Sequence, residues 1–257
     1  MKRIKAEVIS NIQIMPNVYL IWLKACFFAS TASPGQFVML HCDKDILLRR
    51  PLSIHQTDTE RGYIALLFQV VGQGTNRLAQ IKPGAMLDLL GPLGNGFSLS
   101  LKSENILLVG GGIGIAPLPF MARTSRDRGC SVTMLLGATT AEQLCPHHLI
   151  PSSIKCINTT NDGTKGEKGF ITDLLPEYID KADQIFACGP SPMYRVMAKM
   201  SELRDKPVQI SLEVRMGCGF GLCYGCTIRT KSGLKQVCKD GPVFELNDIL
   251  WDEFVDI

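Results

Sequence analysis

Polar and apolar side chains alternate from the first residues of the chain, and short apolar runs continue to about residue 100. Turn signals such as Pro34-Gly35, Pro83-Gly84 and Gly94-Asn95-Gly96 separate these runs. Many short strands punctuated by glycine and proline are typical of an antiparallel barrel or sandwich. Within this part only residues 75–81 have the pattern of a helix. We therefore predict an antiparallel β domain over residues 1–100.

The pattern changes after residue 101, where continuous apolar runs alternate with helical segments. Strands that are buried on both faces read as uninterrupted apolar runs, and helices between them indicate a parallel sheet. We predict an α/β domain over residues 101–212. A separate unit over residues 213–257 is expected, because the alternation stops there and four of the ten cysteines follow. The predicted buried strands are 106–109, 132–136, 154–157, 184–188 and 208–212.

Composition narrows the class of protein further. The chain has 257 residues, 46% of them hydrophobic, which is enough for a substantial core and excludes a disordered chain. The net charge of +3 is spread along the chain, so no nucleic-acid surface is predicted. The N-terminus lacks an apolar signal segment, and the longest apolar run, residues 18–29, is interrupted by Lys24. We expect a cytoplasmic protein without membrane contact, whose cysteines stay reduced.

Four cysteines near the C-terminus form the most specific motif in the chain. Cys218, Cys223, Cys226 and Cys238 have the spacing C-x4-C-x2-C-x11-C. The first three match the plant-type [2Fe–2S] ligand run, in which a glycine-rich loop wraps the cluster and a fourth thiolate comes from a later segment. The sequence therefore predicts a [2Fe–2S] site with these four ligands.

Two other interpretations of the cysteines remain open at this point. A structural zinc site usually pairs two C-x2-C units, whereas only Cys223 and Cys226 have that spacing. Disulfide bonds would need an oxidising compartment that nothing else indicates. Five further cysteines are isolated in the sequence and are expected to be small buried hydrophobic residues: Cys26, Cys42, Cys130, Cys145 and Cys156.

A glycine-rich loop follows the first predicted strand of the α/β domain. Its residues 110–117 read Gly-Gly-Gly-Ile-Gly-Ile-Ala-Pro, and Gly111, Gly112 and Gly114 could bring backbone N–H groups to a phosphate. The dinucleotide fingerprint is incomplete, because Pro117 stands at its third glycine and no carboxylate closer than Glu142 could read a ribose. Nucleotide binding and a tight strand-to-helix turn are both compatible with this loop.

Three other segments are candidates for binding. Cys188-Gly189-Pro190 ends another buried strand, so it lies at the carboxyl edge of the sheet, where ligands bind in open α/β folds. Arg49-Arg50-Pro51-Leu52-Ser53 suits a diphosphate or an aromatic ring edge, although such a segment is more often a solvated basic turn. Gly72-Gln73-Gly74-Thr75 opens the predicted helix, with Thr75 as a candidate cap.

Together these motifs resemble the ferredoxin–NADP reductase superfamily. The tail, 215-RMGCGFGLCYGC-226 followed by 237-VCKDGPVF-244, resembles the family of electron-transfer subunits of class 1B dihydroorotate dehydrogenases, and the resemblance covers essentially the whole chain. It implies a Greek-key β-barrel that binds FAD, a Rossmann-like parallel α/β domain that binds NAD, and a small C-terminal [2Fe–2S] subdomain.

The resemblance also assigns site residues. It implies a cluster held by Cys218, Cys223, Cys226 and Cys238, and it places Cys188 near the nicotinamide as a candidate catalytic residue. Gln69 departs from the arginine that relatives often carry there. The implied FAD contacts are Arg50, Pro51, Leu52, Ser53, Leu67, Phe68, Gln69, Gly74 and Thr75. The implied NAD contacts are Gly111, Gly112, Gly114, Cys188, Gly189 and Pro190.

The function implied is electron transfer between NAD and a partner, an FMN-containing catalytic subunit that oxidises dihydroorotate in pyrimidine (UMP) biosynthesis, in a heterotetramer of two copies of each subunit. Two alternatives remain. One is a subunit of another NAD(P)H–flavin–iron–sulfur system, of the bifurcating transhydrogenase, sulfide dehydrogenase or sulfite reductase type. The other is a redox-sensing module without catalytic function. The residues leave NADH and NADPH undecided, and the resemblance favours NADH.

Overall fold

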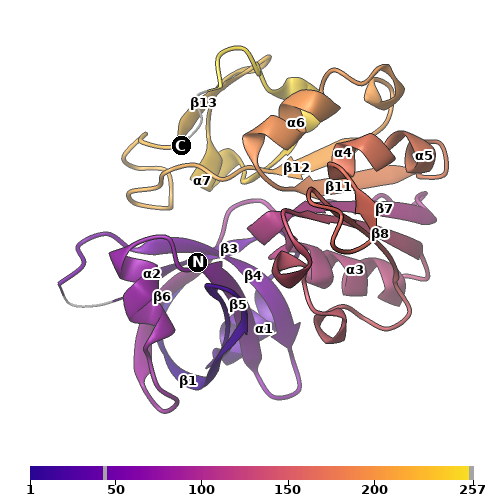
Figure 1. Cartoon of the computed structure of the whole chain (residues 1–257). Helices are drawn as coiled ribbons and strands as arrows, with labels where there is room; N and C mark the ends of the chain where they lie inside the picture. Colours follow the sequence, from indigo (N-terminus) through magenta and orange to yellow (C-terminus); the bar gives the residue numbers. More distant parts are fainter. Residues whose placement is uncertain (43–44, 255–257) are drawn as a thin grey trace.

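The first half of the chain is a six-stranded antiparallel barrel in the computed structural model, which describes residues 1–42 and 45–254. The barrel closes in the strand order β1-β2-β5-β4-β3-β6 and lies beside a larger sheet (Figure 1). The antiparallel domain expected from the alternating pattern is thus confirmed as a barrel. Its strands are β1 (Lys2–Met15), β2 (Val18–Lys24), β3 (Phe37–His41), β4 (Arg50–Asp58), β5 (Tyr63–Gln69) and β6 (Met86–Leu93).

Two short helices lie against the barrel, α1 (Cys26–Thr31) and α2 (Gln73–Ala79). The sequence analysis predicted only α2, and it placed the start of that helix two residues late. It missed α1 because this helix continues an apolar run directly after β2 with no turn residue between them. Phe28 of α1 is fully buried in the barrel core, so packing rather than local sequence explains why this segment is helical.

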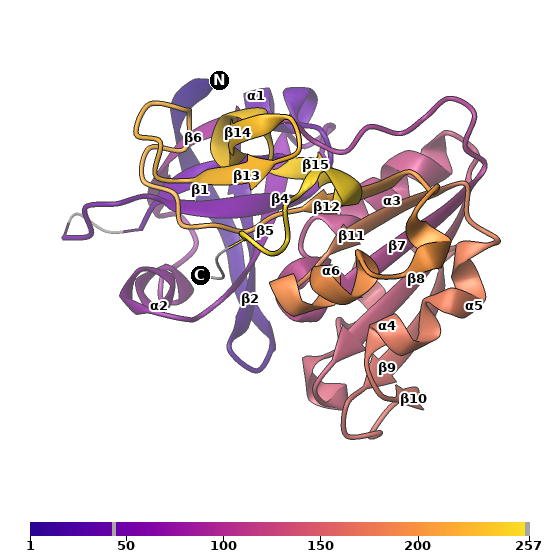
Figure 2. The same ribbon diagram turned by 90° about the horizontal axis from the view of Figure 1, so that it is seen from above.

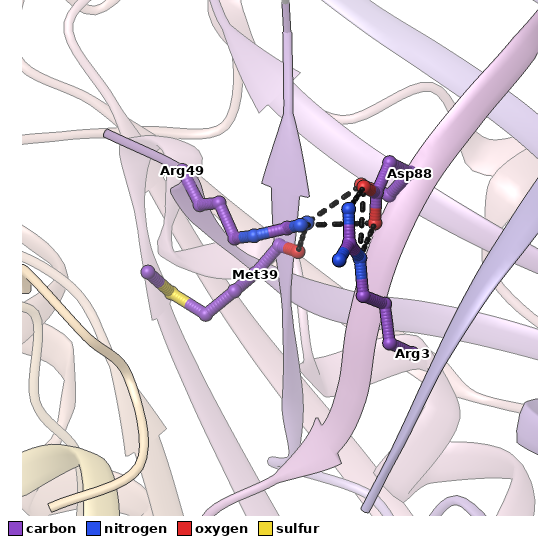
Figure 3. Close-up of polar contacts among 4 residues, drawn as sticks. All are labelled: Arg3, Met39, Arg49 and Asp88. Carbon is purple, nitrogen blue, oxygen red and sulfur yellow. Dashed lines mark hydrogen bonds and ion pairs between the residues drawn. The ribbon is translucent and has the colours of Figure 1, made fainter. Parts of the chain in front are cut away.

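Asp88 on β6 joins three strands of the barrel through two arginines (Figure 3). Arg49 donates to the Asp88 carboxylate at 2.9 Å and to the backbone oxygens of Met39 and Asp88, while Arg3 binds the same carboxylate from β1. Hydrogen bonds from Arg3 and Arg49 hold the pKa of Asp88 below its usual value, against the effect of burial. Arg49 therefore contributes to the structure of the barrel, and we assign the binding role to its neighbour Arg50.

A seven-stranded sheet forms the second half, in the order β10-β9-β8-β7-β11-β12-β15. The strands from β10 to β12 pair in parallel, as the buried apolar runs predict. Helix α3 covers one face, and α4, α5 and α6 cover the other (Figure 1). The strands are β7 (Asn105–Gly111), β8 (Ser131–Ala138), β9 (Lys155–Thr160), β10 (Glu167–Lys168), β11 (Gln184–Cys188) and β12 (Val208–Ser211); the helices are α3 (Leu118–Asp127), α4 (Ile171–Leu174), α5 (Pro176–Ile179) and α6 (Ser191–Met197).

The C-terminal tail lies over both halves, as Figure 2 shows from above. It forms a two-stranded hairpin, a short helix and the edge strand of the large sheet, where β15 pairs antiparallel with β12. The sequence analysis treated the tail as a separate unit and missed this strand, which is only three residues long. We keep 1–100, 101–212 and 213–257 as a proposed division of the chain. The tail elements are β13 (Thr227–Thr230), β14 (Gly233–Gln236), α7 (Val237–Asp240) and β15 (Val243–Glu245).

Five single turns of 3-10 helix complete the described elements: Gly112–Ile115, Ala141–Gln143, His147–Leu149, Ser201–Leu203 and Leu246–Asp248. Among the residues that the structure describes, no helix combines the length and the apolar character that crossing a bilayer requires. The apolar core instead runs through both sheets in three clusters.

Candidate functional site

A cavity of about 1100 Å³ lies where the barrel, the large sheet and the tail meet. This volume is at the upper end of the range for ligand pockets, which is about 300–1,000 Å³. Its walls contain fourteen of the fifteen residues that the resemblance assigns to FAD or NAD. They are Arg50, Pro51, Leu52, Ser53, Leu67, Phe68, Gln69, Thr75, Gly111, Gly112, Gly114, Cys188, Gly189 and Pro190.

The barrel side of the cavity is built from the start of β4, the end of β5 and the start of α2. Gly74, the one assigned residue outside the walls, lies directly behind Arg50: a Cβ added at Gly74 would come within 2.9 Å of the Arg50 Nε atom. The Arg50 guanidinium also donates to the Leu48 backbone oxygen at 2.7 Å. Gly74 therefore leaves room for a cation held at the cavity wall, which suits the diphosphate of a dinucleotide.

Thr75 does not cap α2 as the sequence analysis expected. The cap position is taken by Gly72, and Thr75 lies three residues into the helix. The Thr75 hydroxyl accepts hydrogen bonds from the backbone N–H groups of Val71 and Gly72 at 3.0 and 3.2 Å. The hydroxyl thus fixes the loop before the helix.

The sheet side of the cavity joins two loops that are about 75 residues apart in sequence. Gly114 packs against the backbone of Cys188 and Gly189, because a Cβ added there would lie 2.6 Å from the Gly189 nitrogen. Gly111 faces Pro190 less closely, since a Cβ added at Gly111 would lie 3.0 Å from the Pro190 Cδ atom. Gly112 differs: it has a positive φ of 55° and no atom within 4 Å of an added Cβ, so its backbone is open to a ligand.

The surroundings of Cys188 favour the neutral thiol over the thiolate. Its sulfur lies 3.8 Å from the Ser211 backbone oxygen. Burial and the nearby charge of Glu213 raise the pKa of Cys188 to about 12. Burial therefore disfavours a thiolate at this position near neutral pH and favours a role for Cys188 through its S–H group or its shape.

His55 connects the two halves behind the cavity wall. It lies on β4 two residues after Ser53, it is fully buried, and its Nδ1–H donates to the Ala116 backbone oxygen at 2.7 Å. Arg123 on α3 adds hydrogen bonds to the Thr57 backbone oxygen and the Gln56 side chain. These contacts fix the glycine-rich loop relative to the strand that carries Arg50.

Burial, outweighing the hydrogen bond to Ala116, lowers the pKa of His55 to about 4, against 6.5 for an unperturbed histidine. The unfolded chain therefore binds one more proton than the folded chain between pH 6.5 and pH 4. The free energy of unfolding should fall as the pH is lowered through this window, by about 1.4 kcal/mol per unit and about 3 kcal/mol in total from this group.

Denaturant unfolding of the wild-type protein and of His55→Asn at several pH values between 7.5 and 4 checks this expectation. The asparagine Nδ2 can still donate to Ala116 but does not titrate. The free energy of unfolding of the variant should fall less steeply with decreasing pH, because the proton that His55 takes up on unfolding is no longer involved. Equal slopes in the two proteins would show that His55 is not the responsible group.

The four cysteines of the tail lie together at its glycine-rich loop and form two pairs. Cys218 interacts with Cys223, and Cys226 interacts with Cys238, with a charge effect of Cys218 on Cys238 linking the pairs. The loop wraps closely around the sulfurs: a Cβ added at Gly217 would lie 3.3 Å from the Cys223 sulfur. Two thiol pairs are the donor set that two irons need.

Backbone N–H groups point at the sulfurs as well. Gly221 donates to Cys238 at 3.2 Å, and Leu222 donates to Cys218 at 3.3 Å. Burial opposes ionisation of Cys218, but hydrogen bonds from the backbone of Phe220, Cys223 and Leu222 outweigh it and lower the pKa of this thiol to about 6. Such N–H groups stabilise thiolates and a negatively charged cluster.

Tyr224, between the second and third cysteines, has a positive φ of 58°, which non-glycine residues adopt rarely and mostly at functional sites.

In the described residues, no three His, Cys, Asp or Glu side chains are arranged around one ion position. The pairing of Cys218 with Cys223 and of Cys226 with Cys238 is the observation that fits a cluster with two metal positions.

The other cysteines depart from the expectation in part. Cys42 and Cys145 are buried as predicted, whereas Cys26 is exposed and Cys130 and Cys156 are half-buried. Cys145 and Cys156 are also neighbours, since burial and then the charge of Cys156 raise the pKa of Cys145 to about 12. Sequence spacing could not show this, because β9 brings Cys156 to Cys145 only in the folded sheet.

The cavity also has walls that the sequence analysis did not assign. The segment that follows β12 lines it, and so do the ends of β8 and β9 and the start of α4. A signal existed only for Arg215 and Met216, which belong to the tail motif. The unassigned wall residues include Thr139, Gln143, Asn161, Asp173, Glu213, Val214, Arg215 and Met216.

Comparison with known proteins gives the family. Residues 213–250 match the family described as the iron–sulfur cluster binding domain of dihydroorotate dehydrogenase B, and residues 6–97 match the oxidoreductase FAD-binding domain. The electron transfer subunit of dihydroorotate dehydrogenase B (NAD(+)) from Desulforamulus reducens is 38% identical over 96% of this chain and 98% of its own length. The chain belongs to this family. The corresponding subunit from Geobacillus sp. is also 38% identical, over 97% of this chain and 99% of its own length.

Solved structures agree with the fold of this family. A structure described as that of NADH-dependent reduced ferredoxin-NADP oxidoreductase superposes with a TM-score of 0.88, at 30% identity over 96% of this chain and 90% of that one. The ferredoxin reductase of carbazole 1,9a-dioxygenase has a TM-score of 0.71 at 22% identity, over 81% of this chain and 68% of that one, and shows the fold alone. FAD and an iron–sulfur cluster are thus cofactors of this oxidoreductase subunit, and both predictions are confirmed.

Proposed function

We propose that this chain transfers electrons between NAD and a partner subunit, an FMN-containing dihydroorotate dehydrogenase, in pyrimidine (UMP) biosynthesis. One observation carries the proposal: a single cavity contains both the barrel and the sheet segments, and its wall runs directly into the cluster loop. Arg215 and Met216 line the cavity, and Cys218 follows two residues later. A flavin in the cavity would therefore lie between a nicotinamide on one side and the cluster on the other.

When bound, FAD exchanges a hydride with NAD and passes single electrons to an iron–sulfur cluster. The chain's own residues bind and orient these groups. Arg50 would neutralise the flavin diphosphate, while Leu67, Phe68 and Gln69 would border the flavin where β5 ends. Pro51, Leu52 and Ser53 continue this wall along β4, and the glycine at position 74 keeps space for the Arg50 guanidinium.

NAD would bind at the sheet side of the cavity, with its phosphates at Gly111, Gly112 and Gly114. Cys188, Gly189 and Pro190 would border the nicotinamide. Because the surroundings of Cys188 favour the neutral thiol, the proposed role of this residue is to position the ring against the flavin and to exclude water, without taking a proton.

The cavity wall supports NADH rather than NADPH. At the ends of β8 and β9, where the ribose of a dinucleotide lies in folds of this kind, the wall carries Thr139, Gln143 and Asn161, followed by the carboxylate of Asp173. The arginines of the wall, Arg49, Arg50 and Arg215, all come from the barrel or the tail. Among the described residues of this wall, the α/β part adds the carboxylate of Asp173 and no lysine or arginine, which disfavours the extra negative charge of a 2′-phosphate.

The cluster that we propose is [2Fe–2S], held by Cys218 and Cys223 on one side and by Cys226 and Cys238 on the other. The pairing of the thiols supports it, as do the N–H groups aimed at the sulfurs. Cluster ligation needs reduced cysteines, and no disulfide bond joins cysteines in the part of the chain that the structure describes. We infer a cytoplasmic location, where thiols remain reduced.

The cluster loop also offers a surface for the catalytic subunit. Leu222 and Tyr224 are each 71% exposed, and Phe220 beside them is 38% exposed, although all three are large and apolar. Exposed apolar patches of this kind mark protein interfaces. A partner docked here would receive or deliver electrons directly at the cluster, and two copies of each subunit would complete the proposed heterotetramer.

Co-purification with a dihydroorotate dehydrogenase catalytic subunit, followed by a dihydroorotate-dependent NAD reduction assay, tests the proposal. Leu222→Glu should lower this coupled rate at least about tenfold, because a charge in a desolvated interface costs more than about 1.4 kcal/mol. Reduction of a dye by NADH should not change. Leu101→Glu is the matched control, since Leu101 is 95% exposed in the turn before β7 and should have no effect on either rate. A coupled rate equal in both variants would contradict docking at the cluster loop.

A second candidate is the corresponding subunit of an electron-bifurcating complex, which the TM-score of 0.88 favours. The two functions share cavity and cluster and differ in the partner. A coupled rate with reduced ferredoxin and NADP, in the absence of a dihydroorotate-oxidising subunit, would favour this second candidate.

A further inference from the structure

A buried tyrosine lies immediately behind the loop that we assign to the nicotinamide. Tyr194 on α6 is 1% exposed, and it is not part of the cavity wall. Its hydroxyl accepts a hydrogen bond from the Gly189 backbone N–H at 2.8 Å and donates one to the Ser211 backbone oxygen at 2.7 Å. One side-chain group thus ties the loop after β11 to the end of the neighbouring strand β12.

The Tyr194 hydroxyl lies 2.7 Å from the Ser211 oxygen, whereas the Cys188 sulfur, a weaker donor, lies 3.8 Å from the same oxygen. Gly189 is the first residue after β11, and Ser211 is the last residue of β12. The pairing between these two strands ends at Cys188 and Ser211. The bond from Gly189 to the tyrosine decides how the peptide between Cys188 and Gly189 is oriented. That same peptide packs against Gly114, so its orientation also decides how the two nucleotide loops meet.

The tail holds the tyrosine from the other side. The Tyr194 ring lies 5.7 Å from the Trp251 ring, which in turn lies 5.5 Å from Phe254. The neighbouring Arg195 donates to the backbone oxygens of Trp251 and Phe254. The Trp251 indole N–H donates to the backbone oxygen of Leu246 at 3.1 Å. This hydrogen bond anchors the aromatic stack to the segment after β15.

We propose that Tyr194 is a positioning residue for the nicotinamide site and that the aromatic stack of Trp251 and Phe254 supports it from behind. The inference rests on the proposed binding of NAD at this loop. It means that the C-terminal segment, which follows the cluster ligands in sequence, completes the nucleotide site without touching the nucleotide. Preorganised loops bind more tightly because less ordering remains to be done on binding.

Calorimetric titration of NAD⁺ into the FAD- and cluster-loaded protein tests the inference. Tyr194→Phe keeps the ring and removes only the hydroxyl, so it should weaken NAD⁺ binding about tenfold, because the loosened loop must then be ordered when the nucleotide binds. The KM for NADH in dye reduction should rise by a similar factor, while kcat changes less than about threefold. Trp251→Ala should weaken NAD⁺ binding in the same direction, although Trp251 is outside the cavity wall.

Tyr178→Phe is the matched control. Tyr178 lies on α5, and its interactions are those of its ring with Lys155 and Lys181, which phenylalanine keeps. NAD⁺ binding by this variant should equal that of the wild-type protein. Wild-type affinity and KM in Tyr194→Phe would overturn the inference and leave the proposed function intact. A wild-type protein that neither binds NAD⁺ nor oxidises NADH would instead overturn the proposed function itself.

Discussion

Replacing Cys223 by alanine should remove the iron–sulfur cluster and stop electron delivery to the partner, while the flavin and its reduction by NADH remain. Cys223 is exposed, and its sulfur faces the backbone of Gly217 and Gly225, so the substitution leaves the apolar core untouched. Losing one of four ligands should release most of the iron and lower the coupled rate with dihydroorotate at least about 100-fold, since even changes around metal ligands cost about 10- to 100-fold. Iron content, the visible spectrum and the two rates measure these effects.

Cys26→Ala is the matched control for this experiment. Cys26 is also an exposed free cysteine, but it lies on α1 of the barrel, against Gly62. Iron content and both rates should stay at the wild-type values. Full electron delivery by Cys223→Ala would mean that electrons reach the partner without passing through the cluster, and the proposed order of cofactors would be wrong.

The two sheets could be predicted from the sequence because each has a pattern that depends on local burial. Alternation along residues 2–15 follows from a barrel strand with one face in water, and the run Ile106–Val109 follows from a strand covered on both faces. Helix α1 and strand β15 could not be predicted in this way. Both are short, and both are formed because the rest of the chain offers them a surface or an unpaired edge.

The candidate site shows the same division. Short motifs carry their own chemistry. The sequence alone therefore indicates candidate binding roles for Arg50, the glycine-rich loop and the four cysteines. It does not indicate the contacts between segments. Nothing in the sequence indicates that Arg49 binds Asp88 while Arg50 faces the cavity. Nor does the sequence indicate that the Tyr194 ring contacts Trp251, a tail residue 57 positions away. Such pairings depend on the crossover connections of the sheet and appear only with the tertiary structure.

The contact between the two nucleotide loops leaves no room for a side chain at position 114. A Cβ at position 114 would overlap the Cys188 carbonyl and come within 2.6 Å of the Gly189 nitrogen. These are backbone atoms, which no side-chain rotation can move away. Gly114→Ala should therefore lower the free energy of unfolding by about 3 kcal/mol, the upper end of the usual cost of overpacking.

At about 2–4 °C per kcal/mol for a chain of this size, the melting temperature of Gly114→Ala should fall by roughly 6–12 °C. NADH should no longer reduce the flavin, because the loops that we assign to NAD must separate. Gly129→Ala is the control, in the exposed turn after α3 and outside the cavity wall: its φ of 86° costs an alanine about 1 kcal/mol, but no atom lies within 4 Å of the added Cβ. Melting curves and stopped-flow flavin reduction distinguish the two variants. If Gly114→Ala were as stable and as active as Gly129→Ala, the two loops would not be in contact, and the nicotinamide site would have to be placed elsewhere in the cavity.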